Sequence, residues 1–183
     1  MRAFISAGHW PPKPGVCHEG FCEYDEAIKW VEIIKDELQD LAVVVETGTV
    51  TNKANFVNSR CTPKDVFLEI HFNSAEMAYH RKIEGAETLY YPGSDRGKIL
   101  AERIQDAMLL ADPDGLKDRG TKEGWYQQNK DKGSIYILRK TKCTALIIEP
   151  EFIQQRAAIE AMRRPVSLQV AKCLREILGE HHD

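Results

Sequence analysis

The sequence predicts a single α/β domain with a twisted, mostly parallel or mixed sheet of about six strands, flanked by helices in a layered fold. Strand-like and helix-like segments alternate along the chain, which is typical of layered α/β proteins. The chain has 183 residues, enough for one substantial core and too few for two comfortable domains. Hydrophobic residues make up 43% and charged residues 29%, as in globular proteins. We therefore expect residues 1–183 to fold as one domain.

The expected strands are short runs of apolar or alternating residues. The run from Val66 to Phe72 shows the pattern most clearly, because its apolar side chains recur at every second position. The turn signal Pro92-Gly93-Ser94 ends another run. In chain order, the six expected strands cover residues 2–7, 43–45, 66–72, 86–91, 135–138 and 145–148.

Two helices are expected from apolar stripes at helical spacing. The first covers Tyr24 to Leu41 and the second covers Gly97 to Leu110. The C-terminal segment is also helical in pattern, but Pro165 is expected to interrupt it. A final helix from about Val166 to Leu178 would place this proline in its first turn.

Charge and hydropathy restrict the partners that we expect. The net charge is −3, from 25 basic and 28 acidic residues, and gives no support for binding to nucleic acid or to a membrane surface. No apolar run approaches the roughly 18 residues of a membrane-spanning helix, so we expect no membrane insertion. The apolar stretch at residues 3–7 is shorter than the core of a signal peptide, so we expect no export signal. The protein would then stay in the cytoplasm until it is released to act in the cell wall or periplasm.

The chain contains five cysteines, namely Cys17, Cys22, Cys61, Cys143 and Cys173. An odd number without an export signal favours free thiols in a reducing cytoplasm. The pair Cys17 and Cys22, with the histidine between them, resembles half of a metal site. A second Cys/His pair at zinc-finger spacing is missing, so we do not favour this interpretation.

Three residues able to bind a metal occur at the ends of expected strands. His9 follows the first strand, His71 lies near the end of the strand at residues 66–72, and Glu149 follows the run Ala145–Ile148. In open α/β sheets, sites form beyond the carboxyl ends of the strands. Each of these residues alone is more often structural, but together they indicate a plausible metal site.

Catalytic zinc takes three protein ligands and keeps one position open. His9 and His71 would supply two nitrogens. Glu23 is the best third ligand, because it stands at the start of the first long helix, near the same end of the sheet. Two carboxylates compete with it: Glu26 is one helical turn away, and Glu69 shares a strand face with His71.

Several motifs extend this pattern in chain order. They are Ala7-Gly8-His9, Pro14-Gly15, Glu23 at the head of a helix, Arg60, Glu69-Ile70-His71-Phe72-Asn73, Gly85-Ala86-Glu87-Thr88 with two tyrosines, Leu116-Lys117-Asp118-Arg119-Gly120 and Ile147-Ile148-Glu149-Pro150-Glu151-Phe152. In these motifs the sequence resembles the zinc-dependent N-acetylmuramoyl-L-alanine amidase family, of the amidase 3 type. The resemblance runs from residue 3 to about residue 175 and therefore covers nearly the whole chain.

The resemblance implies a chemical role for each matched residue. His9, Glu23 and His71 would hold Zn²⁺, and Glu149 would be the catalytic acid and base that cuts the amide between N-acetylmuramic acid and L-alanine in peptidoglycan. Arg60 would contact a substrate carboxylate, although a structural ion pair is the simpler interpretation. Asn73 would orient a ligand or the substrate.

The sequence departs from the family pattern at several positions. Glu69 replaces a serine, Gly48 stands where the family commonly has arginine, Cys143 replaces a proline, and Pro150-Glu151 replaces a small residue and glycine. None of these changes removes a ligand. Glu69 and Glu151 do leave the exact assignment of the carboxylates open.

Two alternative functions remain at this stage. A zinc peptidase acting on the stem peptides of the wall is less favoured, because His9 is followed by Trp10-Pro11-Pro12 and not by a His-x-x-Glu motif. A catalytically silent wall-binding module is less favoured because the set of ligands and base is complete. The expected absence of an export signal favours a phage or prophage endolysin, and we predict no particular oligomeric state.

Overall fold

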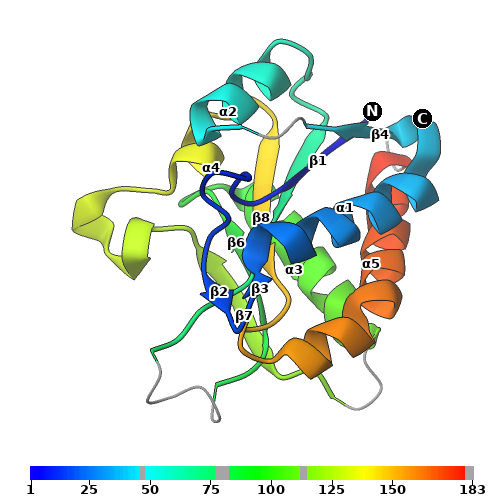
Figure 1. The fold of residues 1–183 in the computed structure, drawn as a ribbon. Helices are drawn as coiled ribbons and strands as arrows, with labels where there is room; N and C mark the ends of the chain where they lie inside the picture. Colours follow the sequence, from blue (N-terminus) through cyan, green and yellow to red (C-terminus); the bar gives the residue numbers. More distant parts are fainter. Residues whose placement is uncertain (46–47, 77–82, 112–114, 180–183) are drawn as a thin grey trace.

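The computed structural model describes residues 1–45, 48–76, 83–111 and 115–179. A six-stranded mixed sheet forms its centre, with the order β4-β1-β5-β8-β6-β7 (Figure 1). The strands are β1 Ala3–Ala7, β4 Ala42–Val44, β5 Val66–Ile70, β6 Ala86–Tyr90, β7 Asp118–Glu123 and β8 Thr144–Glu149. The first four in spatial order are mutually parallel, whereas β6 is antiparallel to β8 and parallel to β7. This sheet confirms the predicted mixed α/β fold.

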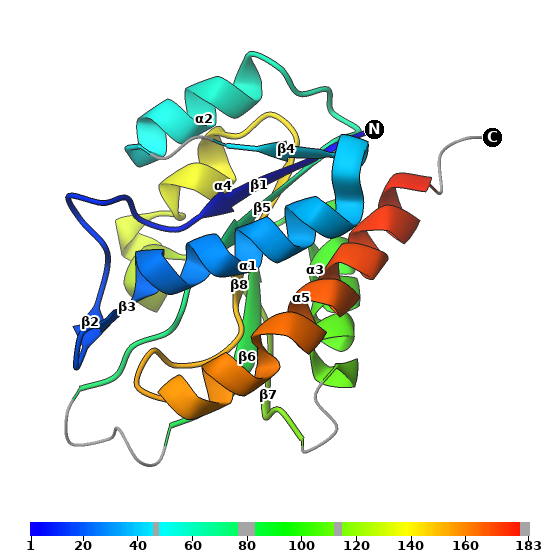
Figure 2. The same ribbon diagram turned by 45° about the vertical axis from the view of Figure 1, so that its right-hand side comes forward.

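Helices cover both faces of the sheet. The helices α1 Glu23–Leu38, α3 Asp95–Leu110 and α5 Arg156–Gly179 lie together on one face, and α2 Val50–Asn58 and α4 Tyr136–Lys140 lie on the other (Figure 2). Short 3₁₀ segments cover Gln39–Leu41, Tyr126–Gln128 and Lys130–Lys132, and a small hairpin pairs β2 Cys17–His18 with β3 Phe21–Cys22.

The two-residue period of the strands builds a separate core on each face. Ile5, Leu68 and Ile148 point into the core under α1, α3 and α5. Phe67 and Ile147 point into the core under α2 and α4. Glu69 lies two residues after Phe67, and Glu149 lies two residues after Ile147. The same alternation therefore places both glutamates on the face covered by α2 and α4. This face therefore receives the charged residues at the carboxyl ends of β5 and β8.

One expected strand is a helix, and one strand was not expected. The run Ile135–Leu138, expected as a strand, instead leads into helix α4, which begins at Tyr136 and buries Ile137 and Leu138. The sixth strand is instead β7, a polar segment at the edge of the sheet that pairs only with β6. A four-residue apolar run satisfies either a buried helix turn or a strand, so periodicity could not separate them.

The predicted interruption at Pro165 is also wrong, because α5 runs through it from Arg156 to Gly179. A proline ring leaves the carbonyl four residues earlier without its helical donor. Both Pro165 and Ala161 lie on the exposed side of α5, where water can satisfy that carbonyl. Among the described residues, no helix is long and apolar enough to cross a membrane.

Candidate metal centre

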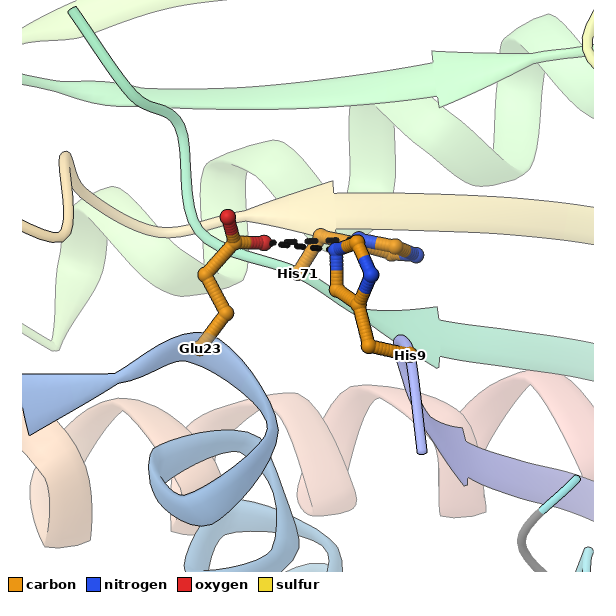
Figure 3. A group of neighbouring side chains, drawn as sticks. All are labelled: His9, Glu23 and His71. Atoms are coloured by element: carbon orange, nitrogen blue, oxygen red, sulfur yellow. Dashed lines mark hydrogen bonds and ion pairs between the residues drawn. The ribbon is translucent and has the colours of Figure 1, made fainter. Parts of the chain in front are cut away.

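Three side chains from separate elements converge at the carboxyl edge of the sheet (Figure 3). His9 follows β1, Glu23 is the first residue of α1, and His71 follows β5. The Nε2 atom of His9 lies 2.9 Å from Oε2 of Glu23, and Nδ1 of His71 lies 3.8 Å from the same oxygen. One ligand atom from each residue fits within 4.8 Å of the others. The structure therefore brings together the three residues predicted as ligands.

Two glycines leave the space that the histidine rings occupy. A Cβ atom at Gly8 would lie 2.4 Å from Cε1 of His71, and a Cβ atom at Gly15 would lie 2.6 Å from Cδ2 of His9. Such distances are too short for carbon atoms to coexist. His9 itself has a φ of 62°, a left-handed conformation that is uncommon outside glycine. The Gly-His and Pro-Gly motifs thus serve to pack both rings close to the backbone.

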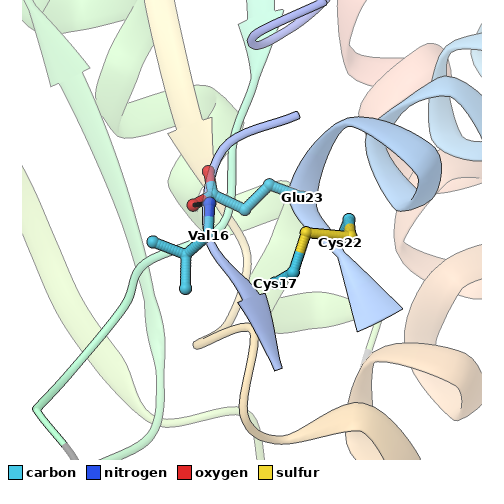
Figure 4. Close-up of a disulfide and its surroundings, with 4 residues drawn as sticks. All are labelled: Val16, Cys17, Cys22 and Glu23. Carbon is cyan, nitrogen blue, oxygen red and sulfur yellow. Dashed lines mark hydrogen bonds between the residues drawn. A yellow bond between two sulfur atoms is a disulfide. The ribbon is translucent and has the colours of Figure 1, made fainter. Parts of the chain in front are cut away.

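The β2–β3 hairpin fixes Glu23 (Figure 4). Cys17 and Cys22 form a disulfide, so the prediction that all cysteines are free thiols is wrong for this pair, as is a metal half-site built on its sulfurs. Cys61, Cys143 and Cys173 form no disulfide among the described residues. The backbone N–H of Val16 donates to Oε1 of Glu23 at 2.9 Å, and that of Glu23 donates to the carbonyl of Val16 at 3.1 Å. One carboxylate oxygen is therefore anchored, which leaves Oε2 facing the two histidines.

The donor set fits a zinc ion in composition and spacing. Two imidazole nitrogens and one carboxylate oxygen are a common set for catalytic zinc. Ligand atoms about 2.0–2.1 Å from a tetrahedral ion stand roughly 3.3 Å apart, and Oε2 of Glu23 lies 2.9 Å from Nε2 of His9 and 3.8 Å from Nδ1 of His71. Burial opposes ionisation of Glu23, but hydrogen bonds with His71 and His9 prevail and lower its pKa to about 2. The carboxylate is therefore in the ionised form that metal ligation requires.

Glu149 is the last residue of β8 and lines the same cavity as His9 and His71. Burial raises its pKa to about 7, and the charges of Glu87 and Glu23 act in the same direction, while His71 opposes them. A carboxyl group that titrates near neutral pH is suited to both accept and donate a proton. This position agrees with the predicted catalytic role.

Two motifs of the sequence meet next to Glu149. Glu87 of β6 is in register with Glu149 of β8. Its carboxylate accepts hydrogen bonds from Nε of Arg119, at 2.9 Å, and from Nζ of Lys122. Burial alone would raise the pKa of Glu87, but these two cations hold it below its usual range. The Gly-x-Glu-Thr and Asp-Arg-Gly motifs are thus joined by an ion pair that keeps Glu87 charged beside Glu149.

Glu26, Glu69 and Glu151 were the carboxylates that left the assignment of ligand and base open. The structure gives Glu26 and Glu151 partners elsewhere in the fold. Glu26 is fully buried and binds Arg163 of α5, the Lys29 ammonium and the indole N–H of Trp30. Glu151 accepts hydrogen bonds from the backbone N–H groups of Gly85 and Phe152. Both therefore act as internal anchors of the fold. Glu69 alone contacts a ligand, since its Oε2 lies 3.3 Å from Nε2 of His71.

Arg60, predicted as a substrate-binding residue, does not lie in this group. Its carbonyl accepts a hydrogen bond from Arg2, at the amino end of β1, and its guanidinium stacks over Phe56 at 3.9 Å. His9 lies beyond the opposite end of β1, a five-residue strand that spans about 16 Å at 3.3 Å per residue. Arg60 therefore lies near the opposite end of β1 from the three grouped residues.

Asn73 lies two residues after His71. Its backbone N–H donates to the carbonyl of Glu151, and its carbonyl accepts from Ile153. Its side-chain Nδ2 is buried and has no hydrogen-bond partner among the described residues. Asn73 thus joins the segments that follow β5 and β8, which carry His71 and Glu149, and its free donor leaves the predicted substrate contact open.

A cavity of about 360 Å³ opens beside the ligand group. Its apolar walls come from Trp10, Val50, Tyr126, Ile135, Ile137 and Ile147, and its polar residues are His9, Lys53, Glu69, His71, Gln127 and Glu149. Sequence reasoning missed Lys53, because a lysine in an unpredicted helix carried no motif. Tyr126 is 55% exposed at the cavity wall.

Comparison with known proteins agrees with this geometry. The profile of the N-acetylmuramoyl-L-alanine amidase family, amidase 3 type, matches residues 4–179. The chain belongs to this family. The amidase CwlM of Bacillus licheniformis is 24% identical over 178 residues, which covers 92% of this chain and 63% of CwlM. An uncharacterised protein of Clostridium perfringens is 30% identical over 116 residues, or 63% of this chain and 31% of that protein. The chain thus spans less than two thirds of either relative.

Solved structures of amidases share the fold. An N-acetylmuramoyl-L-alanine amidase from Clostridium difficile 630 superposes with a TM-score of 0.82 at 20% identity, covering 98% of this chain and 97% of that one. The catalytic domain of the CD27L endolysin, described as targeting Clostridia difficile, gives 0.72 at 23% identity, covering 97% and 96%. At these identities the amidase structures support the six-stranded layered fold.

Proposed function

We propose that this chain is a zinc-dependent hydrolase that cuts the amide bond between N-acetylmuramic acid and L-alanine in peptidoglycan. The observation that carries the proposal is the convergence of His9, Glu23 and His71 at one cavity that also holds Glu149, in a member of the amidase family. His9, Glu23 and His71 would hold the zinc ion, and Glu149 would accept and then donate the proton.

The proposed chemistry is hydrolysis of an amide. Zinc, when bound, would polarise the scissile carbonyl and stabilise the negative charge that develops on its oxygen. Glu149 removes a proton from the attacking water as the water oxygen bonds to the carbonyl carbon. It then gives that proton to the leaving nitrogen as the carbon–nitrogen bond breaks. The products are a muramyl carboxylic acid and a stem peptide with a free L-alanine amine.

The cavity suits a substrate that combines polar and apolar parts. Glu149 and the histidines lie at one side of it, while Ile135, Ile137 and Ile147 form an apolar wall. Apolar walls with a few well-placed polar groups are typical of small-molecule sites. We infer that the wall contacts the aliphatic parts of the stem peptide.

Digestion of purified peptidoglycan tests the proposal. The protein is treated with a chelator, assayed, and assayed again after zinc is added back, with the products identified by mass spectrometry. Zinc-dependent release of stem peptides with new L-alanine amino ends is expected. Cleavage within the stem peptide would instead show a zinc peptidase, and zinc binding without cleavage would show a silent wall-binding module.

We also propose that the chain acts as a phage or prophage endolysin. The support is its similarity in fold to the catalytic domain of the CD27L endolysin. The expected result is that the protein lyses susceptible cells when it is added from outside or released with a membrane-permeabilising partner. Its presence in the periplasm of undamaged, phage-free cells would contradict this role.

A further inference from the structure

An ion pair is buried directly behind His71. Lys53 of α2 and Glu69 of β5 are only 2% and 4% exposed. Nζ of Lys53 donates to Oε1 of Glu69 at 2.8 Å and to the carbonyl of Ala7 at 2.5 Å. Burying two charges is costly unless each is well paired, and breaking such a pair is strongly destabilising. We therefore look for a role of the Lys53–Glu69 ion pair other than packing.

The two oxygens of Glu69 have different partners. Oε1 binds Lys53, and Oε2 lies 3.3 Å from Nε2 of His71. Lys53 is in turn tied to the last residue of β1, two positions before His9. Glu69 is thus held in place by α2 and by the end of β1, and it faces the side of the imidazole ring that is turned away from Glu23.

This arrangement distinguishes the two nitrogens of His71. Nδ1 faces Oε2 of Glu23 at 3.8 Å, and Nε2 faces Glu69. A neutral imidazole carries a proton on one nitrogen and offers a lone pair on the other. With the proton on Nε2, His71 donates to Glu69 and presents its Nδ1 lone pair toward Glu23 and His9. Carboxylate partners of this kind commonly fix the tautomer and orientation of metal-binding histidines.

We propose that Glu69, anchored by Lys53, is a positioning residue that selects the Nε2–H tautomer of His71 and orients its Nδ1 toward the metal. This role rests on the proposed zinc site, and it makes Glu69 a partner of a ligand and not a ligand itself. It also gives a function to the position where this sequence departs from the serine of the family pattern.

Two double variants isolate the hydrogen bond from the ion pair. K53M/E69Q and K53M/E69L both remove the two buried charges, but only the glutamine keeps an oxygen that can accept from Nε2 of His71. We expect K53M/E69Q to bind zinc with an affinity close to that of the natural chain. We expect K53M/E69L to bind it roughly 10–100-fold more weakly, as measured by competition with a chromophoric chelator. Equal affinities of the two variants would overturn the positioning role.

A second measurement needs no variant. Long-range ¹H–¹⁵N correlation spectra of the zinc-loaded natural chain, labelled at histidine, report which nitrogen of His71 carries the proton. The proposal predicts the proton on Nε2, and a proton on Nδ1 would overturn it. Failure of the natural chain to bind zinc at all would instead overturn the metal site of the proposed function. The two failures are therefore distinguishable.

Discussion

Substitution of Glu149 should separate metal binding from catalysis. Its carboxyl group titrates near pH 7 and lines the cavity, but it is not one of the three grouped ligands. We expect Glu149→Gln to keep zinc and to lower turnover by about 10²–10⁴-fold, because general acid–base catalysis contributes roughly that factor. Turnover on peptidoglycan and zinc content by atomic absorption check this. Glu160→Gln, on the surface of α5, is the matched control, and full activity of Glu149→Gln would contradict the assigned role.

Gly8 is a second residue with a specific requirement. A methyl group there would lie 2.4 Å from the ring of His71, so Gly8→Ala should displace this ligand. We expect zinc affinity to fall by about tenfold or more, by analogy with lost partners of metal-binding histidines. Gly48→Ala is the control, because its added carbon would lie 3.5 Å from the nearest atom, Cβ of Asn52. Unchanged zinc affinity in Gly8→Ala would mean that the ring position is not tightly held.

Asp65 gives a prediction of pH dependence away from the site. Its buried carboxylate accepts hydrogen bonds from the backbone N–H groups of Arg2 and Thr62. Burial alone would raise the pKa of Asp65, but these hydrogen bonds hold it below its ordinary value of 3.8. Because the folded-state pKa is the lower one, the stabilisation is present above the unfolded-state pKa and is lost as pH falls through the folded-state pKa.

Asp65→Asn should therefore lower the free energy of unfolding by about 1–3 kcal/mol at neutral pH, as expected for weakened hydrogen bonds to a charged group. The difference from the natural chain should shrink as the solution is acidified. Urea unfolding at a series of pH values measures it. A difference that stays constant into the acid range would show that the charge of Asp65 contributes nothing.

Much of the site could be predicted at the residue scale. His9, His71 and Glu149 each come at the end of an apolar run. Predicting these runs as parallel strands is enough to place the three residues at one edge of the sheet. Lys53 and its contact with Glu69 could not be foreseen, because they depend on how α2 packs over the sheet. The position of Arg60 away from this group could not be foreseen either, because a match to a motif gives an order along the chain but no position in space.

At the scale of elements, the disulfide of the β2–β3 hairpin lies next to Glu23, a proposed metal ligand. The Cys17–Cys22 bond closes a short loop whose flanking residues, Val16 and Glu23, bond to each other. A cross-link of this loop length stabilises by about 2 kcal/mol in the chain-entropy model. We expect reduction to loosen Glu23 and to weaken zinc binding, as measured by chelator competition.

The matching control is the double variant C17S/C22S, which should bind zinc as weakly as the reduced chain and should not respond to reductant. If reduction left the zinc affinity of the natural chain unchanged, the backbone hydrogen bonds between Val16 and Glu23 would suffice without the disulfide. That result would contradict the role of the cross-link.

The elements themselves were predictable where burial gives a long, regular pattern. The stripes of α1 and α3 and the strands β1, β5, β6 and β8 were expected within a few residues. The short helix α4 and the polar edge strand β7 were not, because neither has a distinctive period. Helix α2 follows the capping residue Thr49, whose hydroxyl accepts a hydrogen bond from the backbone N–H of Asn52. Because α2 is short, this capping residue alone did not predict the helix from the sequence.

At the scale of the whole molecule, the direction of the strands creates the site. The parallel strands β1, β5 and β8 end at one edge, which brings His9, His71 and Glu149 together from distant parts of the sequence. The antiparallel β6 starts at the same edge and adds Glu87 beside Glu149. Helix α1 also begins there, and its first residue, Glu23, completes the proposed ligand set. The fold therefore explains why ligands and base are so widely spaced in the chain.

The central claim is that one zinc ion is held by His9, Glu23 and His71 at this edge. Its most direct test is the zinc stoichiometry of the purified chain and of three variants, His9→Ala, Glu23→Ala and His71→Ala, after equilibration with limiting free zinc. Circular dichroism verifies that each variant is folded. The account predicts one zinc ion per natural chain and almost none in each folded variant. A natural chain without zinc, or folded variants that keep it, would contradict the account.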